Sequence, residues 1–497
     1  MDSPELLSNL LIDETTELRD VLRALDQTGL RIVFVTDASS RLVGAISDGD
    51  MRRGLLAGHG LDEPASAVMN KNFITLPESL PESEARAHVS DRITVIPIVD
   101  GVGRAQRFVL EKDPEFIPAA EPLLGGNEIS YVVDCLSSGW ISSQGAYVAA
   151  FENAFAKLTG VPVGQAITVS NGTVALQLAL AALDVGPGDE VIVPDLTFAA
   201  TLNAVLHVGA SPVIVDVDPI QLTMDPTAVR AAITSRTRAI MPVHLYGQMS
   251  DMGKLGEIAR EHGLLVIEDA AEALGSRLGS RHAGTLGDAG TFSFFANKLI
   301  TTGEGGMVVF SDPEVAARAR VLRDHGMDTK KRYWHLEAGF NFRLTNLQAA
   351  IGLAQLEKVD ELLAAKIRLA GSYTERLADL SELIILPEVD PNNVHSFWNF
   401  VVLFRDIFAG DVADQMLRFM RARKIDSRRL FYPMHVMPPY ANLRRIGDCP
   451  NSVSASRTGV AFPASPKLTE KQIDDICKTF RSGIEMLNVK RLSAIGR

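Results

Sequence analysis

The sequence predicts an α/β protein in which a mostly parallel sheet lies between helices, preceded by a smaller unit. From about residue 127, short apolar runs alternate with apolar-periodic segments of helical spacing. Such alternation is typical of a parallel sheet whose strands are joined by helices packed on both faces. The first hundred or so residues show a different order, strand–helix–strand, which occurs twice. A length of 497 residues also exceeds one ordinary core and indicates several structural units.

The composition is that of a soluble globular enzyme, with 46% hydrophobic and 22% charged residues. The formal net charge of −12 argues against broad DNA or RNA binding. No apolar run is long enough for a membrane helix, and the first residues lack a basic signal-peptide segment, so we expect a cytoplasmic protein without membrane association. The three cysteines are scattered without metal-ligand spacing, and we expect no metal.

The elements of the first unit follow from short local patterns. The spacing of apolar residues over 17–29 predicts a helix. Two strands that end in turns are predicted by RIVFVTD (31–37) and LVGAISDGD (42–50). A second helix is predicted to begin in MRRGLLAG (51–58). A weaker echo follows in VMNKNFITLPES (68–79), a helix through ESEARAHVS (82–90) and the strand ITVIPIVD (93–100). The segment EKDPEFIPAAEPLLGG (111–126) contains three prolines and a double glycine, which are typical of a linker.

This doubling resembles a tandem pair of cystathionine-β-synthase (CBS) modules over roughly residues 5–112. We expect a CBS-pair domain over residues 1–118 and a linker over 119–126. In that family the turn Gly-x-x-Ser/Thr-x-x-Asp often holds a nucleotide ribose, and Gly44, Ser47 and Asp50 fit it. The resemblance therefore implies an adenine or guanine nucleotide at Ser47 and Asp50. Ordinary turn chemistry is the simpler explanation of the same residues, and the second module departs from the pattern at FVLEKD (108–113).

The second half alternates helices and strands in a regular order. Four helices are predicted by TVALQLALAALD (173–184), TFAATLNAVLHVG (197–209), TAVRAAIT (227–234) and a segment ending in EIAREHG (257–263). Four strands are predicted by EVIVPD (190–195), PVIVDV (212–217), RAIMPVH (238–244) and LLVIEDA (264–270). In open sheets of this kind ligands bind outside the carboxyl ends of the strands, so residues directly after strands are the first candidates for a site.

Lys298 is the conspicuous candidate for covalent chemistry. It lies in GTFSFFANKLITTGEGGMVVF (290–310), among aromatic, small and hydroxyl residues. A lysine that forms a Schiff base must be desolvated or lie beside another cation, because the protonated amine is a poor nucleophile. Gly303, Gly305 and Gly306 would let the backbone approach a flat ligand closely. A lysine near glycines is also a common solvated loop residue, so this block alone leaves both interpretations open.

Two further blocks complete a cofactor-binding pattern. Asp269 ends the strand LLVIED, where a carboxylate can pair with a pyridinium nitrogen; the alternative is a helix N-cap. The run from Ser170 to Thr173 directly precedes an apolar helix, and a helix N-terminus with a hydroxyl is a ready phosphate site. Helix capping alone could also explain Thr173. The order of these blocks, each at a strand end, makes their combination stronger than any one of them.

Residues from about 125 to 490 resemble the DegT/DnrJ/EryC1/StrS family of sugar aminotransferases. The matching blocks include VSNGTVALQLAL, PDLTFAATLNAV, VHLYGQ, IEDAAEALGS, GTFSFFANKLITTGEGGMV, FNFRLTNLQAAIGLAQLE and FYPMH. The resemblance implies a fold-type I architecture, pyridoxal 5'-phosphate (PLP) as cofactor, and a homodimer with active sites at the subunit interface. It also implies a large PLP-binding domain over 127–370 and a small C-terminal α+β domain over 371–497.

The family's functional residues carry over onto matching positions. Lys298 would hold the cofactor and move the proton, Asp269 would hold the pyridinium nitrogen, and Glu272 would lie near the phenolic oxygen or the ring edge. Phe198 would stack on the ring. The phosphate would be bound by Gly172, Thr173 and Ser293, with Asn341 reaching across from the other subunit. For Phe198 and Asn341, core packing and turn chemistry are the alternatives.

The resemblance also implies a reaction and a substrate class. Glutamate would donate the amino group, and the acceptor would be a nucleotide-linked 4-keto-6-deoxysugar destined for surface polysaccharide. The blocks favour GDP-4-keto-6-deoxymannose over UDP- or dTDP-linked sugars, whereas amination at C3 instead of C4 stays open. Plausible substrate contacts are Trp140, Ile141, Ser142, Lys331 and His435. A solvated basic face around Lys331 and a structural histidine at 435 are the alternatives.

Two rival functions remain to be weighed. A dehydratase of the same family has histidine in place of the lysine, and Lys298 counts against it. A CBS-regulated scaffold without catalytic activity is the other rival, and the presence of Asp269, Lys298 and the phosphate block in one chain counts against decay.

Overall fold

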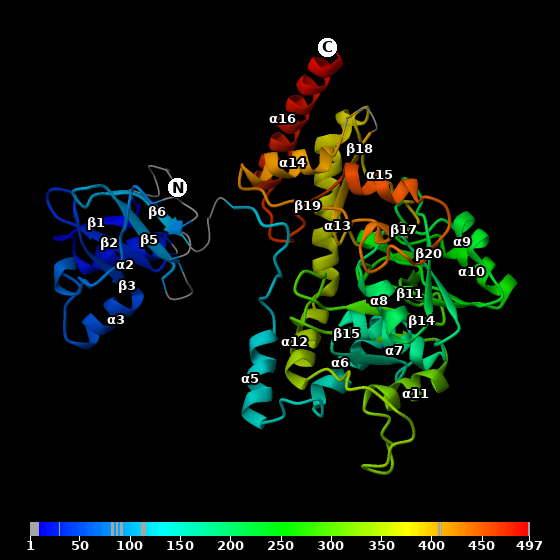
Figure 1. Cartoon of the computed structure of the whole chain (residues 1–497). Coiled ribbons are helices and arrows are strands. Elements are labelled where there is room, and N and C mark those ends of the chain that lie inside the picture. Colours follow the sequence, from blue (N-terminus) through cyan, green and yellow to red (C-terminus); the bar gives the residue numbers. More distant parts are fainter. Residues whose placement is uncertain are drawn as a thin grey trace. The chain divides into compact units, whose positions relative to one another are not determined.

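The chain divides between Phe116 and Ile117 into two units, Met1–Phe116 and Ile117–Arg497, each with its own core. The computed structural model (Figure 1) describes residues 9–28, 30–80, 84–85, 88–89, 93–110, 116–405, 408 and 410–495. Among these residues no helix combines the length and the apolar character needed to cross a membrane. The predicted CBS-pair domain ends at residue 118, two residues after Phe116, and its boundary and the predicted linker over 119–126 stay predictions.

The first unit contains two three-stranded sheets of identical topology. In each, the first two strands pair in parallel and the second and third pair as an antiparallel hairpin with an irregularity before the last pair. The strands are β1 (Leu11–Asp13), β2 (Ile32–Thr36) and β3 (Leu42–Ser47) in one sheet and β4 (Leu76–Pro77), β5 (Val95–Val99) and β6 (Ala105–Leu110) in the other. The doubling expected from the sequence is therefore a repeat of structure.

The two hairpin turns of this unit are built by the same aspartate device. Asp37 accepts hydrogen bonds through Oδ1 from the backbone N–H groups of Ser39 and Arg41, both 2.9 Å. Asp100 accepts the equivalent bonds from Val102 (3.0 Å) and Arg104 (2.9 Å). Aspartate favours such turns because its short carboxylate reaches backbone amides two residues ahead.

Helices complete the first unit. α2 (Leu18–Thr28) buries Leu18, Val21 and Leu25, whose spacing places them on one face. These side chains pack against strand residues of the first sheet such as Val33 and Ile46. α3 (Asp48–Leu56) follows β3 directly. The helix predicted over 82–90 lies largely outside the described residues.

An eight-stranded sheet forms the centre of the second unit, in the order β20-β9-β8-β10-β11-β14-β15-β7. All neighbouring pairs are parallel except those that β15 makes with β14 and β7. The strands are β7 (Ala166–Val169), β8 (Glu190–Pro194), β9 (Ser211–Val215), β10 (Thr237–Ile240), β11 (Leu265–Asp269), β14 (Ala289–Ser293), β15 (Gly306–Phe310) and β20 (Arg444–Arg445). The predicted mostly parallel sheet is thus confirmed.

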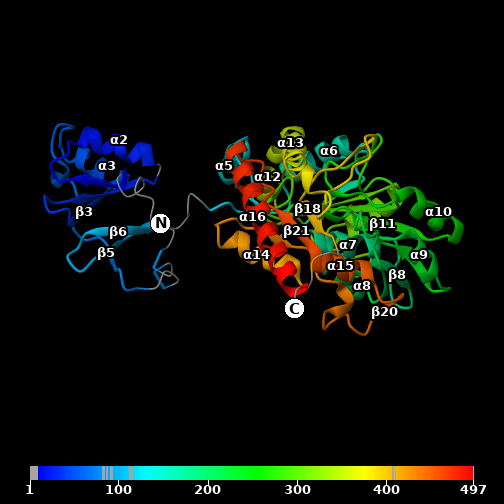
Figure 2. The same ribbon diagram turned by 90° about the horizontal axis from the view of Figure 1, so that it is seen from above.

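Helices cover both faces of this sheet, as the alternation of buried residues requires (Figure 2). In β8, Val191 and Val193 belong to one apolar cluster, whereas Ile192 between them belongs to another. Successive strand residues point to opposite faces, so two separate helix layers are needed to bury them. The helices are α5 (Glu128–Ser138), α6 (Ala146–Thr159), α7 (Gly172–Ala182), α8 (Ala200–His207), α9 (Pro226–Ala232), α10 (Met252–His262), α11 (Pro313–Arg323) and α12 (Asn346–Leu356).

The C-terminal part is a four-stranded antiparallel sheet, β16-β18-β21-β19, packed on long helices. Its elements are β16 (Ile384–Ile385), β18 (Phe400–Phe404), β19 (Arg428–Arg429), β21 (Gly459–Phe462), α13 (Val359–Leu377), α14 (Val412–Arg421), α15 (Pro450–Thr458) and α16 (Glu470–Ile495). A small third sheet joins β12 (Arg277–Leu278), β13 (Arg281–His282) and β17 (Asn393–Val394). α13 runs continuously through position 370, and the predicted division of large and small domains there stays a prediction.

The segment that follows the first unit is attached to the second unit. Ile117 is 6% exposed and its N–H donates to the carbonyl of Lys424, while its own carbonyl accepts from the N–H of Asp426 (2.8 Å each). Two residues on, the carbonyl of Ala119 accepts from the N–H of Ala464 (2.8 Å). These residues therefore belong to the fold of the second unit.

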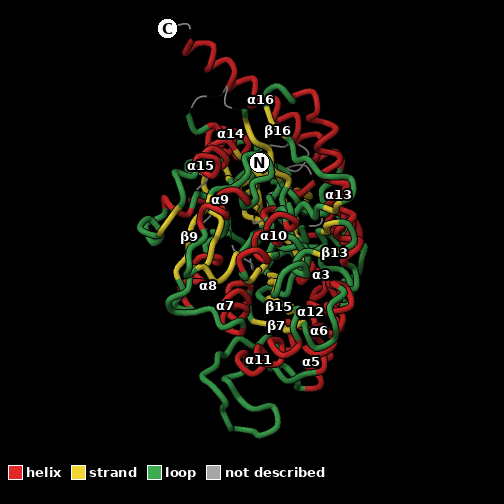
Figure 3. The backbone as a smooth tube through the Cα atoms, turned by 90° about the vertical axis from the view of Figure 1, so that its right-hand side faces the viewer, coloured by secondary structure: helices red, strands yellow, loops and turns green. Residues whose placement is uncertain are grey.

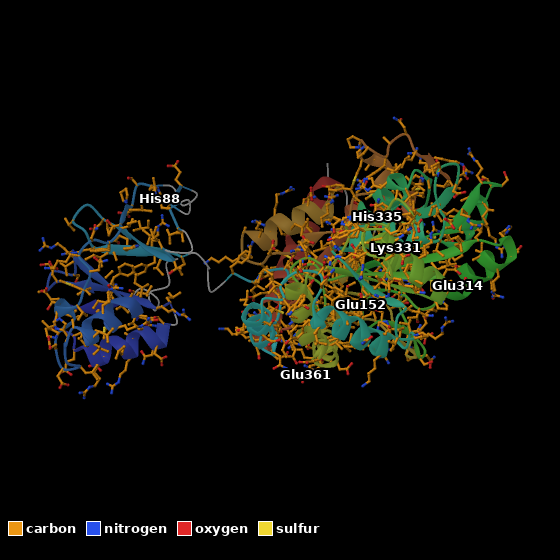
Figure 4. All side chains as sticks on the ribbon, turned by 90° about the horizontal axis from the view of Figure 1, so that it is seen from below. His88, Glu152, Glu314, Lys331, His335 and Glu361 are labelled. Atoms are coloured by element: carbon orange, nitrogen blue, oxygen red, sulfur yellow. The ribbon has the colours of Figure 1, made fainter. Side chains whose placement is uncertain are left out.

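A long loop follows α11 and extends away from the helices (Figure 3). It contains Lys331 and His335, which Figure 4 marks. The loop is held by its own backbone, since the N–H of Asp328 donates to the carbonyl of Trp334 (2.8 Å). Tyr333, Trp334 and Leu336 are 75%, 53% and 59% exposed. The loop thus presents both basic and aromatic side chains to its surroundings.

Candidate active site

The predicted site residues meet because the parallel strands end at one edge of the sheet. β7 leads to Asn171 and Gly172, β8 to Phe198, and β14 ends at Ser293, five residues before Lys298. β11, the strand between β10 and β14, ends at Asp269 itself. Since β7, β8, β11 and β14 run in the same direction, their carboxyl ends form one edge, where open α/β sheets bind ligands.

Lys298 lies in a confined polar and aromatic environment. Its Nζ is 3.6 Å from Oε1 of Glu272 and 3.9 Å from the ring centroid of Trp398, and the side chain is 13% exposed. Burial lowers the pKa of Lys298, although the nearby carboxylates of Glu272 and Asp269 oppose this shift. A lowered pKa increases the fraction of neutral amine, the form that attacks an aldehyde carbon.

Asp269 lies at the floor of the site and is 5% exposed. Its Oδ2 accepts the hydroxyl proton of Thr201 (2.8 Å) and its Oδ1 accepts the N–H of Ala271 (3.2 Å). Burial raises the pKa of Asp269, which these two hydrogen bonds partly offset. A buried carboxylate in this situation is stabilised in its charged form by an adjacent cation, such as a protonated ring nitrogen.

A second buried pair supports Asp269 from behind. Glu268 accepts backbone N–H groups from Gly284 (2.9 Å), Leu286 (2.6 Å) and Gly287 (2.7 Å), and it pairs with Nε2 of His244 at 2.8 Å. Nδ1 of His244 accepts the N–H of Ser250 (3.2 Å), so the ring proton lies on Nε2 and points to Glu268. No local signal in the sequence points to this pair, although its residues fall in the blocks VHLYGQ and IEDAAEALGS.

Glu272 is held by the backbone of a neighbouring segment. Its Oε2 accepts the N–H of Tyr246 at 2.8 Å, and Tyr246 has a left-handed backbone with φ of 56°. Burial raises the pKa of Glu272 to about 7. With Nζ of Lys298 at 3.6 Å from its other oxygen, Glu272 is placed to exchange a proton with that amine.

The predicted phosphate site is a cradle at the start of α7. Asn171 caps the helix by accepting the N–H of Val174 (3.0 Å), and Gly172 and Thr173 form its first turn. A Cβ atom added to Gly172 would lie 2.9 Å from Cβ of Ser293, so only glycine lets this turn approach the end of β14. A helix N-terminus flanked by two hydroxyl residues provides donors that fit a phosphate group.

Phe198 is 59% exposed and lies at the end of a series of aromatic rings. It contacts Phe431 (centroids 5.8 Å apart, planes at 53°), and Phe431 stacks on Tyr246 (5.6 Å, 25°). Tyr246 in turn is parallel to Trp398 (6.2 Å, 6°), the residue next to Lys298. We call these four residues the aromatic wall. An exposed ring beside this wall provides a flat apolar surface on which an aromatic ligand can stack.

The residues expected to contact the substrate are not all brought together. Trp140 and Ile141 are 58% and 46% exposed on a loop anchored by Asn346, whose backbone N–H donates to the carbonyl of Ser142 (2.7 Å). Lys331 lies on the loop after α11 with its Nζ 3.9 Å from the ring centroid of Trp334. The structure of one chain therefore leaves their common role a prediction.

Two further predicted residues have partners within the chain. His435 pairs through Nδ1 with Oδ2 of Asp195 (2.7 Å), which fixes it to the end of β8. Among the described residues, Asp195, His435 and Cys449 also form one group whose possible metal-ligating atoms lie within 4.8 Å of one another. Oδ1 of Asn341 accepts from Nε of Arg343 (3.1 Å), so a role of Asn341 in another subunit stays a prediction.

In the first unit, Ser47 and Asp50 form a capping box at the start of α3. Oγ of Ser47 accepts the N–H of Asp50 (3.3 Å), and Oδ2 of Asp50 accepts both the N–H (2.9 Å) and the hydroxyl (2.6 Å) of Ser47. Arg53 pairs with the remaining carboxylate oxygen at 2.6 Å. Helix capping thus accounts for these two residues, and nucleotide binding there stays a prediction.

Comparisons with known proteins agree with this geometry. The sequence model of the DegT/DnrJ/EryC1/StrS aminotransferase family matches residues 122–481, and that of the CBS domain matches residues 7–57. A GDP-perosamine synthase of Caulobacter vibrioides is 49% identical over 72% of this chain and 96% of its own length.

Two solved structures extend the likeness to the fold. The aminotransferase TlmJ from Streptoalloteichus hindustanus is 31% identical, with a TM-score of 0.71, over 75% of this chain and all of that one. The PLP form of the sugar aminotransferase Spr1654 from Streptococcus pneumoniae is 27% identical, with a TM-score of 0.70, over 75% of this chain and 99% of its own.

The residues of the site are also chemically suited to bind PLP. A buried lysine of lowered pKa, a buried carboxylate at the floor, a helix-terminal phosphate cradle and an exposed ring for stacking are the four features that PLP needs. The protein is a PLP-dependent enzyme, and the chain belongs to the DegT/DnrJ/EryC1/StrS aminotransferase family.

Proposed function

We propose that this protein transfers the amino group of glutamate to C4 of GDP-4-keto-6-deoxymannose, which yields GDP-perosamine. The observation that carries the proposal is Lys298, buried between Glu272 and Trp398 at the edge of the sheet, in a chain 49% identical to a GDP-perosamine synthase. The 49% identity extends over 96% of that relative, so it includes both the cofactor site and the rest of the catalytic unit.

Each residue of the site has a distinct part in this reaction. When bound, PLP supplies an electron sink that stabilises negative charge at the substrate carbon. Lys298 would hold the cofactor through Nζ. When Nζ is free, it would take the proton from the carbon of glutamate and pass it to C4′ of the cofactor in the first half-reaction, and it would carry a proton from C4′ to C4 of the sugar in the second. Asp269 keeps a proton on the ring nitrogen, and Glu272 exchanges a proton with Nζ of Lys298. Because one site serves both the donor and the acceptor, ping-pong kinetics are expected.

Recognition of the sugar nucleotide falls to the exposed aromatic and basic residues. The diphosphate carries negative charge, which Lys331 and the adjacent Lys330 and Arg332 can neutralise. Trp140, Ile141 and Ser142 lie on an exposed loop and offer apolar and hydroxyl contacts to the base or the sugar. His435 adds a ring held in place by Asp195.

A homodimer would complete the site. Ile129, Val133 and Leu136 of α5 are 80%, 51% and 60% exposed, and their spacing of four and three residues places them on one helix face. Exposed apolar faces of this kind mark protein interfaces. We propose that α5 and the loop after α11 pack on a second copy of the chain, which would bring Asn341 of one subunit toward the phosphate cradle of the other.

The test is a substrate panel with glutamate as donor. GDP-, UDP- and dTDP-linked 4-keto-6-deoxysugars are incubated with the enzyme, and products are analysed by mass spectrometry and NMR. Conversion of the GDP-linked substrate at C4 is expected. Preference for another nucleotide, or amination at C3, would redirect the substrate assignment without touching the cofactor chemistry.

The visible absorption spectrum distinguishes the enzyme from the alternative of a non-catalytic scaffold. The protein with PLP should show a visible band that borohydride abolishes and that Lys298→Ala lacks. A wild-type protein that stays colourless with PLP would support the scaffold.

We further propose that the first unit binds an adenine or guanine nucleotide near Ser47 and Asp50 and adjusts activity or assembly. The match of residues 7–57 to the CBS domain supports this. Calorimetric titration of the full chain with AMP, ATP and GDP tests it, and absence of binding heat for all three would remove the proposal.

A further inference from the structure

Trp398 makes two contacts with the loop that carries the reactive lysine. Its ring centroid lies 3.9 Å from Nζ of Lys298, and its indole N–H donates to the carbonyl of Asn297 at 2.8 Å. The side chain is 8% exposed. Because the ring and the N–H contact adjacent residues of one loop, the indole has little freedom to leave the lysine.

Lys366 of α13 holds the backbone of Trp398. Its Nζ donates to the carbonyl of Trp398 (3.0 Å) and to that of Ala464, and Lys366 is 5% exposed. Both acceptors are backbone carbonyls, and in the part of the chain that the structure describes no carboxylate pairs with this amine. Burial lowers the pKa of Lys366 to about 7. Through these two hydrogen bonds, Lys366 links α13 to Trp398, two residues before β18, and to Ala464. We call this link the Lys366 clamp.

Tyr246 of the aromatic wall packs against the ring of Trp398. Tyr246 stacks on Trp398 with the ring planes 6° apart, and the N–H of Tyr246 donates to Glu272. Thus Tyr246 contacts both groups that lie near Nζ of Lys298, the indole through its ring and the carboxylate of Glu272 through its N–H.

This arrangement has a clear electrostatic consequence. An ammonium group over an indole face is attracted by the ring quadrupole, and the attraction is stronger when water is excluded, whereas a neutral amine gains much less. Among the described residues, the charged groups that act on Lys298 include Asp269 at the end of β11, Glu272 three residues later and Arg428 of β19. The carboxylates favour the ammonium, and Arg428 and burial disfavour it. The indole adds a contribution that favours the ammonium without adding a charge.

We infer that Trp398 is a further catalytic residue, whose ring holds the protonated Nζ of Lys298 beside Glu272 whenever that nitrogen is not bonded to cofactor carbon. Lys366 is the positioning residue that keeps the indole in place. The inference rests on the proposed function, because an aminotransferase releases and reuses this lysine in each turnover. The contact with the indole would keep the protonated Nζ of Lys298 close to the carbon to which the proton must be transferred.

Chemical labelling of the enzyme without PLP tests the inference directly. Trace acetic anhydride acylates only neutral amines, and the extent of labelling at Lys298 is followed by peptide mass spectrometry across pH. The plateau at high pH reports access to the amine, and the midpoint of the curve reports its ionisation. For Trp398→Leu the neutral fraction on the acidic side of the midpoint should rise about three- to tenfold. Trp398→Phe keeps a ring and should change it less.

Lys366→Met tests the positioning role by the same measurement. It should move the midpoint in the same direction as Trp398→Leu, and the double variant should move it no further than Trp398→Leu alone. Lys254→Met, at an exposed position, is the matched control and should leave the curve unchanged.

Each outcome has a distinct meaning. An unchanged midpoint in Trp398→Leu, with a folded protein and normal plateau, overturns the role of the indole. A double variant that exceeds Trp398→Leu overturns the role of Lys366 as its clamp. If wild type forms the visible band and aminates a ketosugar while the midpoint does not respond, only this inference fails. If wild type forms no band at all, the proposed function fails first.

Discussion

Lys366 offers a quantitative test of the packing behind the active site. Its amine is fully enclosed with backbone carbonyls as partners, and burial lowers its pKa from 10.5 to about 7. Between these two values the unfolded chain binds a proton that the folded protein does not, so the free energy of unfolding rises with pH. Below about pH 7 both states carry the proton, and this contribution is absent.

The size of the effect follows from this pKa difference. Each pH unit within the window adds about 1.4 kcal/mol, so raising the pH from about 7.5 to about 9.5 should stabilise wild type by roughly 2–3 kcal/mol relative to Lys366→Met. Residues 117–497 form the unit that unfolds, and at about 2.1 cal/mol/K per residue its unfolding entropy is roughly 0.8 kcal/mol/K. The melting temperature of wild type should therefore gain about 3 °C on that of the variant.

The assay is thermal melting of wild type and Lys366→Met at both pH values and one heating rate. Lys254→Met, which removes an exposed lysine, corrects for general effects of pH on lysine variants. A gap between wild type and Lys366→Met that stays constant across the two pH values would refute the reasoning. It would mean that Lys366 keeps its proton in the folded protein.

Three other predictions concern the site and the interface. Glu268→Gln should cost about 3–5 kcal/mol and lower the melting temperature and soluble yield, because an amide NH₂ would face backbone N–H groups in a buried place. Thr201→Val removes the hydroxyl donor of Asp269 and should weaken PLP binding about five- to twentyfold in an absorbance titration, since hydrogen bonds to charged groups contribute roughly 1.5 kcal/mol or more. Ile129→Asp should shift the protein from dimer to monomer in analytical ultracentrifugation, because it buries a charge in the proposed interface.

The first two of these have a matched control, and all three have a contrary result. Glu261→Gln, at an exposed ion pair, should leave the melting temperature nearly unchanged, and equal effects at Glu268 and Glu261 would contradict the role of the buried pair. Thr201→Ser should restore PLP affinity; an affinity unchanged in Thr201→Val would show that the hydroxyl is dispensable. A dimer that persists in Ile129→Asp would place the interface elsewhere.

The parts of the fold that depend on local pattern could be predicted from the sequence. The alternation of apolar runs predicted the parallel sheet, because strand and helix periodicity are local properties. That Lys298 and Asp269 lie near one another could be predicted, because Asp269 ends a strand and Lys298 follows the end of the neighbouring strand by five residues, and parallel strands bring such positions together. The capping box of Ser47 and Asp50 also spans only three residues, and turn chemistry was already one of its two predicted explanations.

The surroundings of Lys298 could not be predicted in this way. Trp398 lies 100 positions after Lys298 in the chain, and Lys366 contacts Trp398 across 32 positions. A lone tryptophan or lysine in a helix or strand carries no local signal of such contacts, and a lysine in α13 would ordinarily be assigned to the solvent face. Thr201 is likewise 68 residues from the carboxylate it serves. Only the packing of α8, α13 and β18 brings these residues to the site.

The attachment of residues 117–119 determines where the chain can be shortened. The N–H of Ala464 donates a hydrogen bond to the carbonyl of Ala119. The carbonyl of Ala464 in turn accepts a hydrogen bond from Nζ of Lys366. An isolated catalytic fragment that starts after residue 119 would lose this strand-like anchor and loosen the support of Trp398. One that starts at or before Ile117 would keep it, so fragments differing by only a few amino-terminal residues should differ in thermal stability and in the reactivity of Lys298.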